Sequence, residues 1–346
     1  MALLTSEVRW CVLVDSTLLY GGKDSKITYT RDVLISNLPE DDDNDILLKY
    51  REMKSNILNF VETTVVSMSD CEFKARFRLS RTTIEILLQN LTLPLGTYKM
   101  EIPVNKQVLV FVWYMANCET HRQIGNRFDI AESTSYKIIT HCLTEMNNLS
   151  GKFIQWPTNL KAQTNVQKFN RLRGIVDSDL KFIDCFSGWP GSSHDARVFR
   201  CSKIGEKLLT QPCVILPPGC HILGDYAYPL TSTLMVPFKD NGHLSDIQLK
   251  FNKCLSSSRV VIEQAFGKLI GRFRKLKHMD VYHKEYCCKI ITTACCLHNL
   301  CIDNFDDFDI TETYSSQIEY RNQHEDDTLS GNVKRQELCH QLSLVL

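Results

Sequence analysis

The spacing of apolar residues changes once along this chain, near Trp156-Pro157, and this change limits the fold to a helical region followed by a mixed region. From Asp45 to Leu149, apolar residues recur at the three- and four-residue intervals of helices. Beyond that point, short extended runs alternate with loops. We therefore predict a helical domain over 46–150 and an α/β domain over 151–303, with the boundary near Ser150-Gly151.

The second half of the helical region predicts three helices in the order of a helix-turn-helix unit. Thr120 and Gln123 form a possible capping box that would begin the short middle helix. The third helix would begin at Glu132, and its first turns offer hydroxyl groups and Lys137 to a nucleic acid. A plain three-helix bundle explains the same pattern, so the segment alone supports weak DNA contact at most.

Composition excludes two classes of protein. The 15 cysteines occur as adjacent pairs and singles in a long chain, which predicts a reducing compartment rather than a secreted disulfide scaffold. No apolar run approaches the roughly 20 residues of a membrane-spanning helix, so we expect a soluble, intracellular protein without membrane contact. The net charge is zero, so any nucleic-acid affinity must come from local clusters of Lys and Arg.

Both ends of the chain contain acidic stretches, and the sequence predicts no function for either end. Residues 1–45 show no clear period and finish in the acidic run 40–43, which we interpret as a linker. Residues 304–346 follow the last helical pattern and begin with many acids, so we expect a flexible tail.

Two acids stand where a metal ligand would be expected. Asp225 ends the apolar run that begins at Cys220, and Glu263 lies among apolar residues of a helix predicted over 256–273. A buried carboxylate is costly unless it is paired or bound to a metal, and such oxygens suit Mg²⁺ or Mn²⁺. We predict that the two carboxylates lie within about 8 Å of each other, although a pair between Glu263 and Arg259 is the simpler alternative.

A basic segment surrounds the predicted helix. Residues 251–284 hold eight Lys or Arg against two acids. A backbone-binding surface for DNA is one interpretation, and a solvated helix face is the other. The residues predicted to contact DNA are Arg259, Arg272, Arg274, Lys275 and Lys277.

Four motifs follow one another in an order that resembles a known family. They are Gly191-Ser192-Ser193-His194-Asp195-Ala196-Arg197-Val198-Phe199, Leu223-Gly224-Asp225 with Tyr228-Pro229, Arg259-Val260-Val261-Ile262-Glu263-Gln264-Ala265-Phe266-Gly267, and Cys295-Cys296-Leu297-His298-Asn299. This set resembles the PIF/Harbinger superfamily of DDE transposases, and most closely the Harbinger transposase-derived nucleases of animals. With Phe77-Arg78-Leu79-Ser80, the resemblance runs from about Phe73 to Asp303.

The resemblance implies a fold class and an activity. It implies an α/β, RNase H-like DDE nuclease domain preceded by a helical, helix-turn-helix-like domain. It also implies a divalent metal cation held by two Asp and one Glu, hydrolysis of DNA phosphodiester bonds, and a Myb-like (SANT-type) partner protein. No small-molecule cofactor is implied, and the expected location is the nucleus, also the cytoplasm. Asp225 takes the place of the second acid and Glu263 that of the third.

The first acid of the resemblance has no clear counterpart in this sequence. It belongs on a first strand, but only Asn170 to Gly174 separate the preceding segment from residues that match the end of the second strand. Asp177 imitates the missing motif and is the weaker candidate, with Asp195 as another stand-in. We therefore expect a first-strand region to be missing and the chain not to cut DNA at a useful rate. The alternative function is a catalytically inactive DNA-associated adaptor that binds the Myb-like partner.

The last apolar helix carries a cluster of thiols and imidazole. A zinc site built from Cys295, Cys296, His298 and Cys301 is conceivable, but cysteines at this spacing more often act as small buried apolar residues. We predict instead that His298 and Asn299 are structural and tie this helix to the sheet through buried hydrogen bonds.

Overall fold

The computed structural model describes residues 10–12, 57–97, 100–156, 174–177, 179–186, 195–217, 219–277, 279, 284–308 and 327–345. In β1 and in short stretches of the helices, including residues 259 and 261–263, the description is confined to the backbone. The strands are β1 (Trp10–Val12), β2 (Gly174–Val176), β3 (Phe182–Cys185), β4 (His221–Leu223) and β5 (Leu234–Met235). The helices of the first region are η2 (Val61–Val65), α2 (Asp70–Phe77), α3 (Arg81–Gly96), α4 (Val104–Ala116), α5 (His121–Phe128), α6 (Glu132–Asn148) and α7 (Ser150–Phe153). Those of the second region are α9 (Asp195–Cys201), α10 (Lys203–Thr210), α11 (Pro212–Ile215), α12 (Asp246–Arg272), η3 (Arg274–Leu276), α13 (Lys284–Asp303) and α14 (Leu329–Val345). The described chain is mostly helical with one small sheet, an α/β arrangement.

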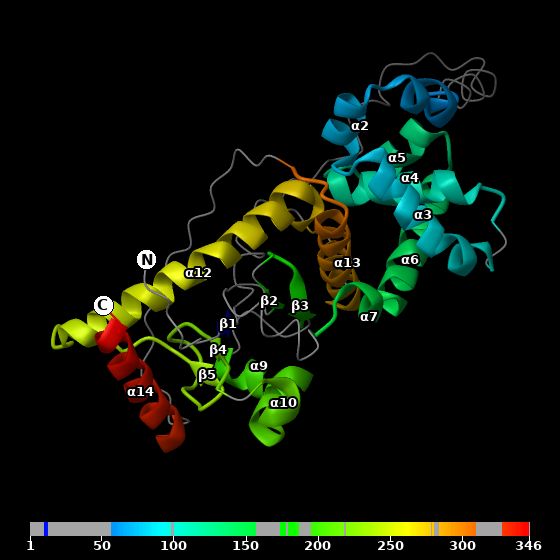
Figure 1. Ribbon diagram of the computed structural model, residues 1–346. Coiled ribbons are helices and arrows are strands. Elements are labelled where there is room, and N and C mark those ends of the chain that lie inside the picture. The colour runs from blue at the N-terminus through cyan, green and yellow to red at the C-terminus, as the bar shows by residue number, and fades with distance from the viewer. Residues whose placement is uncertain are drawn as a thin grey trace, which may run out of the picture.

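The helices α2 to α6 gather into one unit beside the sheet, and the long helix α12 runs past the sheet to reach them (Figure 1). The predicted capping box begins α5, because the Thr120 hydroxyl accepts from the Gln123 backbone and Gln123 accepts from the Thr120 N–H. Asp129 ends α5 in the left-handed conformation, so the chain turns sharply into α6. Edge-on contacts of Trp113 with Phe77 and Phe128, at ring distances of 5.1 and 5.9 Å, fill the centre of the unit.

Among the described residues, the sheet contains five strands in the order β3-β2-β1-β4-β5. Strands β2 and β3 form the hairpin predicted from the sequence, and β4 coincides with the predicted run before Asp225. The central strand β1 comes from the N-terminal segment, for which the sequence predicts no element. It runs antiparallel to β2 and parallel to β4. A central strand that is covered on both sides needs only a short apolar run. Periodicity alone cannot distinguish such a run from part of a buried helix.

Helix α12 begins earlier than the sequence predicts. A capping box at Ser245 and Gln248 starts it at Asp246, nearly three turns before the predicted start at Ser256, and Phe251 and Leu255 add to its buried side.

The C-terminal residues 327–345 differ from the predicted flexible tail. Helix α14 packs against α12 and β5, and the Lys334 Nζ donates to the Cys220 and Ser232 carbonyl oxygens at 3.1 and 2.8 Å. Gly331 lies so close to the Leu230 backbone that an added Cβ would come within 2.8 Å of its oxygen. The acidic segment before this helix suggested a tail, but Leu338 and Cys339 of the helix are buried in the core.

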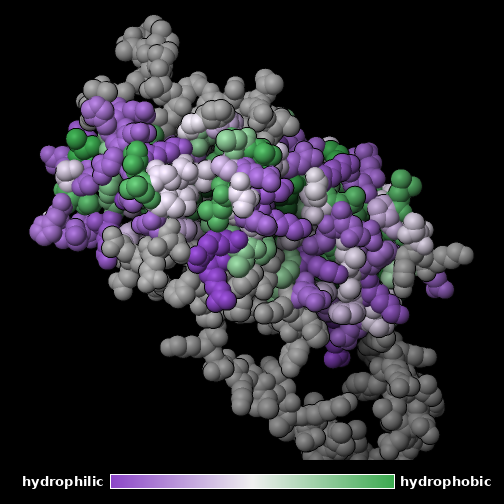
Figure 2. Space-filling model, turned by 90° about the horizontal axis from the view of Figure 1, so that it is seen from below, coloured by the Kyte–Doolittle hydropathy of each residue, from purple (hydrophilic) through white to green (hydrophobic). Residues whose placement is uncertain are grey.

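Among the described residues, none of the helices is long and apolar enough to cross a membrane. On the face shown in Figure 2, hydrophobic residues lie in small separate groups among hydrophilic ones. This visible face therefore favours polar over apolar recognition.

Candidate metal and nucleic-acid site

Asp225 stands directly beyond the end of β4, the strand that pairs with the central strand on one side and with β5 on the other. Its side chain is 5% exposed, and its Oδ1 accepts from the Ala227 N–H at 2.8 Å. Gly224 makes the placement possible, because a Cβ at this position would come within 3.3 Å of both Leu234 and Tyr228. The sheet thus presents a buried carboxylate at the end of an apolar strand, as the sequence predicts.

Glu263 lies on α12, four turns or more after the start of that helix. Its side chain and that of Arg259 are outside the described residues. The predicted approach of Glu263 to Asp225, and the alternative pair with Arg259, therefore stay predictions. Within the described side chains, no group of three His, Cys, Asp or Glu is arranged to hold a metal.

Asp177 closes the turn between β2 and β3. Its Oδ1 accepts from the Asp179 and Lys181 N–H groups at 2.9 and 3.0 Å. Burial raises the pKa of Asp177 to about 6, and these two hydrogen bonds offset part of that effect.

The strand register separates Asp177 from Asp225. Val12 is level with Val176 on one side and with Leu223 on the other, and β2 runs opposite to β4. Asp177 therefore lies about three residues back along the strands and two strands across, roughly 10 Å in each direction. At that separation the two carboxylates cannot share a metal ion, so we leave Asp177 out of the proposed site.

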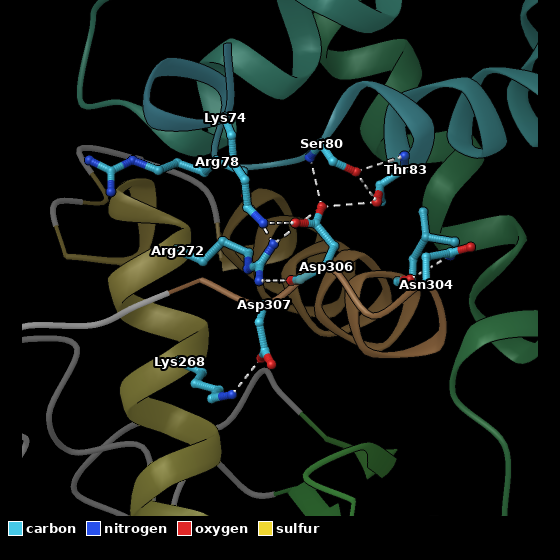
Figure 3. Close-up of polar contacts among 10 residues, drawn as sticks. Lys74, Arg78, Ser80, Thr83, Lys268, Arg272, Asn304, Asp306 and Asp307 are labelled. Carbon is cyan, nitrogen blue, oxygen red and sulfur yellow. Dashed lines mark hydrogen bonds and ion pairs between the residues drawn. The ribbon is translucent and has the colours of Figure 1, made fainter. Parts of the chain in front are cut away.

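Arg272, predicted from sequence to contact DNA, is 4% exposed and lies in a joint between the two regions (Figure 3). Its guanidinium donates to the Arg78 carbonyl oxygen at 3.0 Å and to that of Asp306, and it pairs with the Asp306 carboxylate at 3.7 Å. This arginine is engaged inside the protein, so we also leave it out of the proposed DNA surface.

Asp306 is the centre of this joint. Its carboxylate pairs with Lys74 of α2 at 2.7 Å and accepts from the Ser80 N–H and the Thr83 hydroxyl at the start of α3 at 2.7 and 2.9 Å (Figure 3). Burial favours a higher pKa for Asp306, but the Lys74 hydrogen bond, the Ser80 N–H and the charge of Arg272 together lower it. The joint fixes the helical region against the ends of α12 and α13.

A cavity of about 500 Å³ adjoins the joint and is bordered by ionic groups of both signs. Lys181 pairs with Asp303 there, and Lys268 pairs with Asp307. Its lining includes neither Asp225 nor Asp177, so the cavity is separate from the candidate metal site.

The basic residues that follow α12 divide into buried and exposed ones. Lys275 is 8% exposed, and its ammonium lies 4.7 Å from the centre of the Tyr114 ring. Arg274 and Lys277 are exposed. Since the Cys118 thiol donates to the Arg274 carbonyl oxygen at 3.3 Å, η3 lies against the segment that leads into α5.

The first turns of α5 and α6 expose polar groups near this place. Arg122 is exposed at the start of α5, and Ser133 and Lys137 are exposed at the start of α6. The His121 ring contacts Tyr136 edge-on at 5.3 Å, so the two helix starts lie together. Lys275 also acts on this ring. Burial is the main cause that lowers the pKa of His121, and the positive charge of Lys275 is the second.

His298 and Asn299 have the structural roles that the sequence predicts. The His298 Nε2 bonds to the Leu180 carbonyl oxygen at 2.9 Å, and burial lowers the pKa of His298 to about 4. Asn299 exchanges two hydrogen bonds with the backbone of Phe182 and donates a third to the Phe153 carbonyl oxygen. The neighbouring Cys295, Cys296 and Cys301 are buried thiols.

One feature that sequence reasoning missed is the N-terminal strand. The run Trp10-Cys11-Val12-Leu13-Val14 ends in Asp15, an apolar run followed by an acid like the one that ends in Asp225. The likeness of these two runs is the signal in the sequence that could have predicted the N-terminal strand. Asp15 itself lies outside the described residues.

Comparisons with known proteins agree with the resemblance. The model of the DDE superfamily endonuclease family matches residues 154–299. Relatives include the Arabidopsis thaliana protein Antagonist of Like Heterochromatin Protein 1, 24% identical over 69% of this chain and 75% of that protein. The HARBI1 proteins of Homo sapiens and Bos taurus, which are named as candidate nucleases, are 22% and 28% identical over 64% of this chain and 73% of theirs. No solved structure gave a significant match. Over residues 154–299 the chain is therefore similar to the DDE superfamily endonucleases, and over about two thirds of its length it is similar to the HARBI1 and Antagonist of Like Heterochromatin Protein 1 proteins.

Proposed function

We propose that this protein hydrolyses DNA phosphodiester bonds with Mg²⁺ or Mn²⁺ held by Asp225 and Glu263. The observation that carries the proposal is the buried Asp225 carboxylate beyond the end of β4, a strand parallel to both of its neighbours. Carboxylate oxygens suit these cations, and a bound cation offsets part of the cost of burying the charge. The family match spans both acids.

The sheet supports an RNase H-like interpretation of the second domain. The family resemblance places the first acid on a first strand that is central in the sheet. In this chain β1 occupies the central position, with the second and third strands on one side and β4 on the other. The expectation of an inactive chain depended on a missing first strand and on the acid that it carries. A strand in this position argues against the first of these grounds, and the inactivity itself stays a prediction.

Asp15 is our proposed first carboxylate in place of Asp177. Strands β1 and β4 are parallel, and the sequence after each reaches an aspartate, Asp15 three residues after Val12 and Asp225 two residues after Leu223. Parallel neighbours end at the same edge of a sheet. The role of Asp15 follows from its position in the sequence relative to β1.

The protein residues have two tasks in this reaction. The carboxylates hold the cations at fixed positions, and exposed cationic side chains hold the DNA backbone near them. When bound, the metal ions supply charge stabilisation for the attacking and leaving oxygens. Exclusion of water around the buried Asp225 strengthens each electrostatic contact.

Metal binding tests the proposal directly. Titration of Mn²⁺ by calorimetry should show binding to the wild-type chain and strongly weakened binding to Asp225→Asn and Glu263→Gln. The control is Glu101→Gln, which removes one negative charge as the other two substitutions do, but at an exposed position away from the site. Equal Mn²⁺ affinity in all four proteins would refute the site.

The proposed DNA surface joins η3 to the helix-turn-helix-like unit. Exposed Arg274 and Lys277 lie beside the start of α5, where Arg122 is exposed, and the start of α6 exposes Lys137. In helix-turn-helix proteins the first helix crosses the DNA backbone while the second enters the major groove. Such an arrangement would let both regions bind one duplex.

Charge removal tests this surface without cleavage. In EDTA, the double variant Arg274→Gln with Lys277→Gln should bind duplex DNA more weakly, with the slope of log affinity against log salt reduced by about 2. The control is Lys203→Gln with Lys207→Gln, which removes two exposed cations from α10. Equal losses in the two variants would show that charge acts only through the net charge of the chain.

The alternative function is a DNA-associated adaptor that does not cut. The name of the Arabidopsis relative, which refers to antagonism of a heterochromatin protein, favours it. A Myb-like (SANT-type) partner protein and a nuclear location are proposed for both functions, and the cytoplasmic location stays a prediction. An adaptor would bind DNA with unchanged affinity after Asp225→Asn and show no metal-dependent cleavage.

A further inference from the structure

The N-terminal strand occupies a gap that divides the sheet. Strand β2 pairs with β3 and with β1, and β4 pairs with β5 and with β1. Without β1, the described strands would form two separate pairs, each with an unpaired edge. Unpaired backbone groups inside a protein are costly, and exposed strand edges attract other strands.

The residues just before β2 in the sequence are poorly suited to form a strand in this gap. Residues 170–173, which precede β2, read Asn-Arg-Leu-Arg, and two arginines in four residues do not suit a strand that is central in a sheet. The run Trp10-Cys11-Val12-Leu13-Val14 is apolar throughout and rich in aromatic and β-branched residues. It has the composition of a central strand.

The pairing is specific in direction as well as in composition. Trp10, Cys11 and Val12 are level with His221, Ile222 and Leu223 in a parallel ladder, while Val12 is level with Val176 in an antiparallel one. Residues 13–56 connect the strand to the first helical region. The entropic cost of closing a long loop rises only slowly with its length, so a distant segment can supply this strand.

We infer that the gap between β2 and β4 is a strand-binding site and that the N-terminal segment of the same chain is its ligand, a donated strand on which the sheet depends. The strand would take the place of the first-strand region that the sequence predicts to be missing between Phe169 and Ile175. The inference concerns the sheet alone and requires neither metal nor DNA, so its test is independent of the proposed nuclease function.

Two substitutions at one position separate backbone pairing from side-chain effects. Cys11→Pro removes an N–H from the strand and cannot be accommodated in a central strand, whereas Cys11→Val keeps the N–H and favours a strand. Amide hydrogen exchange of the full chain, read by mass spectrometry, reports on peptides that contain β2 and β4. We expect exchange there to rise at least about tenfold in Cys11→Pro but not in Cys11→Val, with α4 as the internal reference.

Addition of the missing strand completes the test. A synthetic peptide of residues 1–20, at a concentration on the order of a millimolar to match that of a tethered segment, should restore protection to the Cys11→Pro chain. The same peptide with Pro at position 11 should not. Equal protection of β2 and β4 in the two chain variants, or a loss that the wild-type peptide does not reverse, would overturn the inference.

Discussion

At the scale of single residues, burial sets the chemistry of the carboxyl groups in the sheet. Asp184 lies on β3 level with Ile175, and burial raises its pKa to about 6, the value that Asp177 also has. Asp177 receives two backbone hydrogen bonds, whereas burial is the one resolved cause for Asp184. A raised pKa is therefore not evidence of a catalytic role in this sheet.

The raised pKa of Asp184 predicts a pH-dependent cost. The folded chain keeps this proton up to about pH 6 while the unfolded chain loses it near pH 4, so the contribution of Asp184 to stability falls as the pH rises through this window. Asp184→Asn should therefore be more stable than wild type at pH 7.5, by on the order of 1–2 kcal/mol after allowance for partial exposure, and the difference should shrink at pH 4. Thermal melting at the two pH values measures it, and a less stable variant at pH 7.5 would show that the carboxylate has a favourable partner.

At the scale of elements, the sequence predicted the parts that carry a local signal. The capping box of α5, the hairpin of β2 and β3 and the run before Asp225 have short-range signatures, and the roles of His298 and Asn299 followed from burial. The places of β1 and α14 could not be read locally, because each is held by partners far away in the sequence, such as Ile222 for Cys11 and Leu230 for Gly331. For the same reason, exposure could not be assigned within the basic run, where Arg272 is buried and Arg274 is exposed.

The joint at Asp306 makes a prediction about how the elements are held together. Asp306→Asn would leave the buried Arg272 and the Lys74 ammonium without their carboxylate, and removal of one partner from such a network costs about 3–5 kcal/mol. Asp307→Asn is the matched control, since that exposed pair with Lys268 should contribute less than about 1 kcal/mol. Urea unfolding of the two variants measures the difference. The contribution of Asp306 should be present above about pH 4 and lost as the pH falls further, because its pKa is lowered in the folded chain.

At the scale of the whole molecule, the described contacts connect the sheet, the helical unit and η3. The N-terminal strand completes the sheet that positions Asp225, the joint at Asp306 holds the helical unit against α12 and α13, and η3 carries exposed cations to the starts of α5 and α6. A duplex bound across the helical unit and η3 would be held at a fixed orientation to the sheet. This arrangement is what cleavage at defined phosphates requires, because position and electrostatics supply most of the catalysis in phosphoryl transfer.

The central claim is that the carboxylate at the end of β4 supports metal-dependent cleavage of DNA. The most direct measurement is the nicking of supercoiled plasmid in Mn²⁺ by the wild-type chain, Asp225→Asn and the surface control Glu101→Gln, with EDTA as the blank. We predict nicking by the wild type and by Glu101→Gln, and a loss of at least about a hundredfold in Asp225→Asn. No nicking by the wild type, or nicking by Asp225→Asn at the wild-type rate, would contradict the claim.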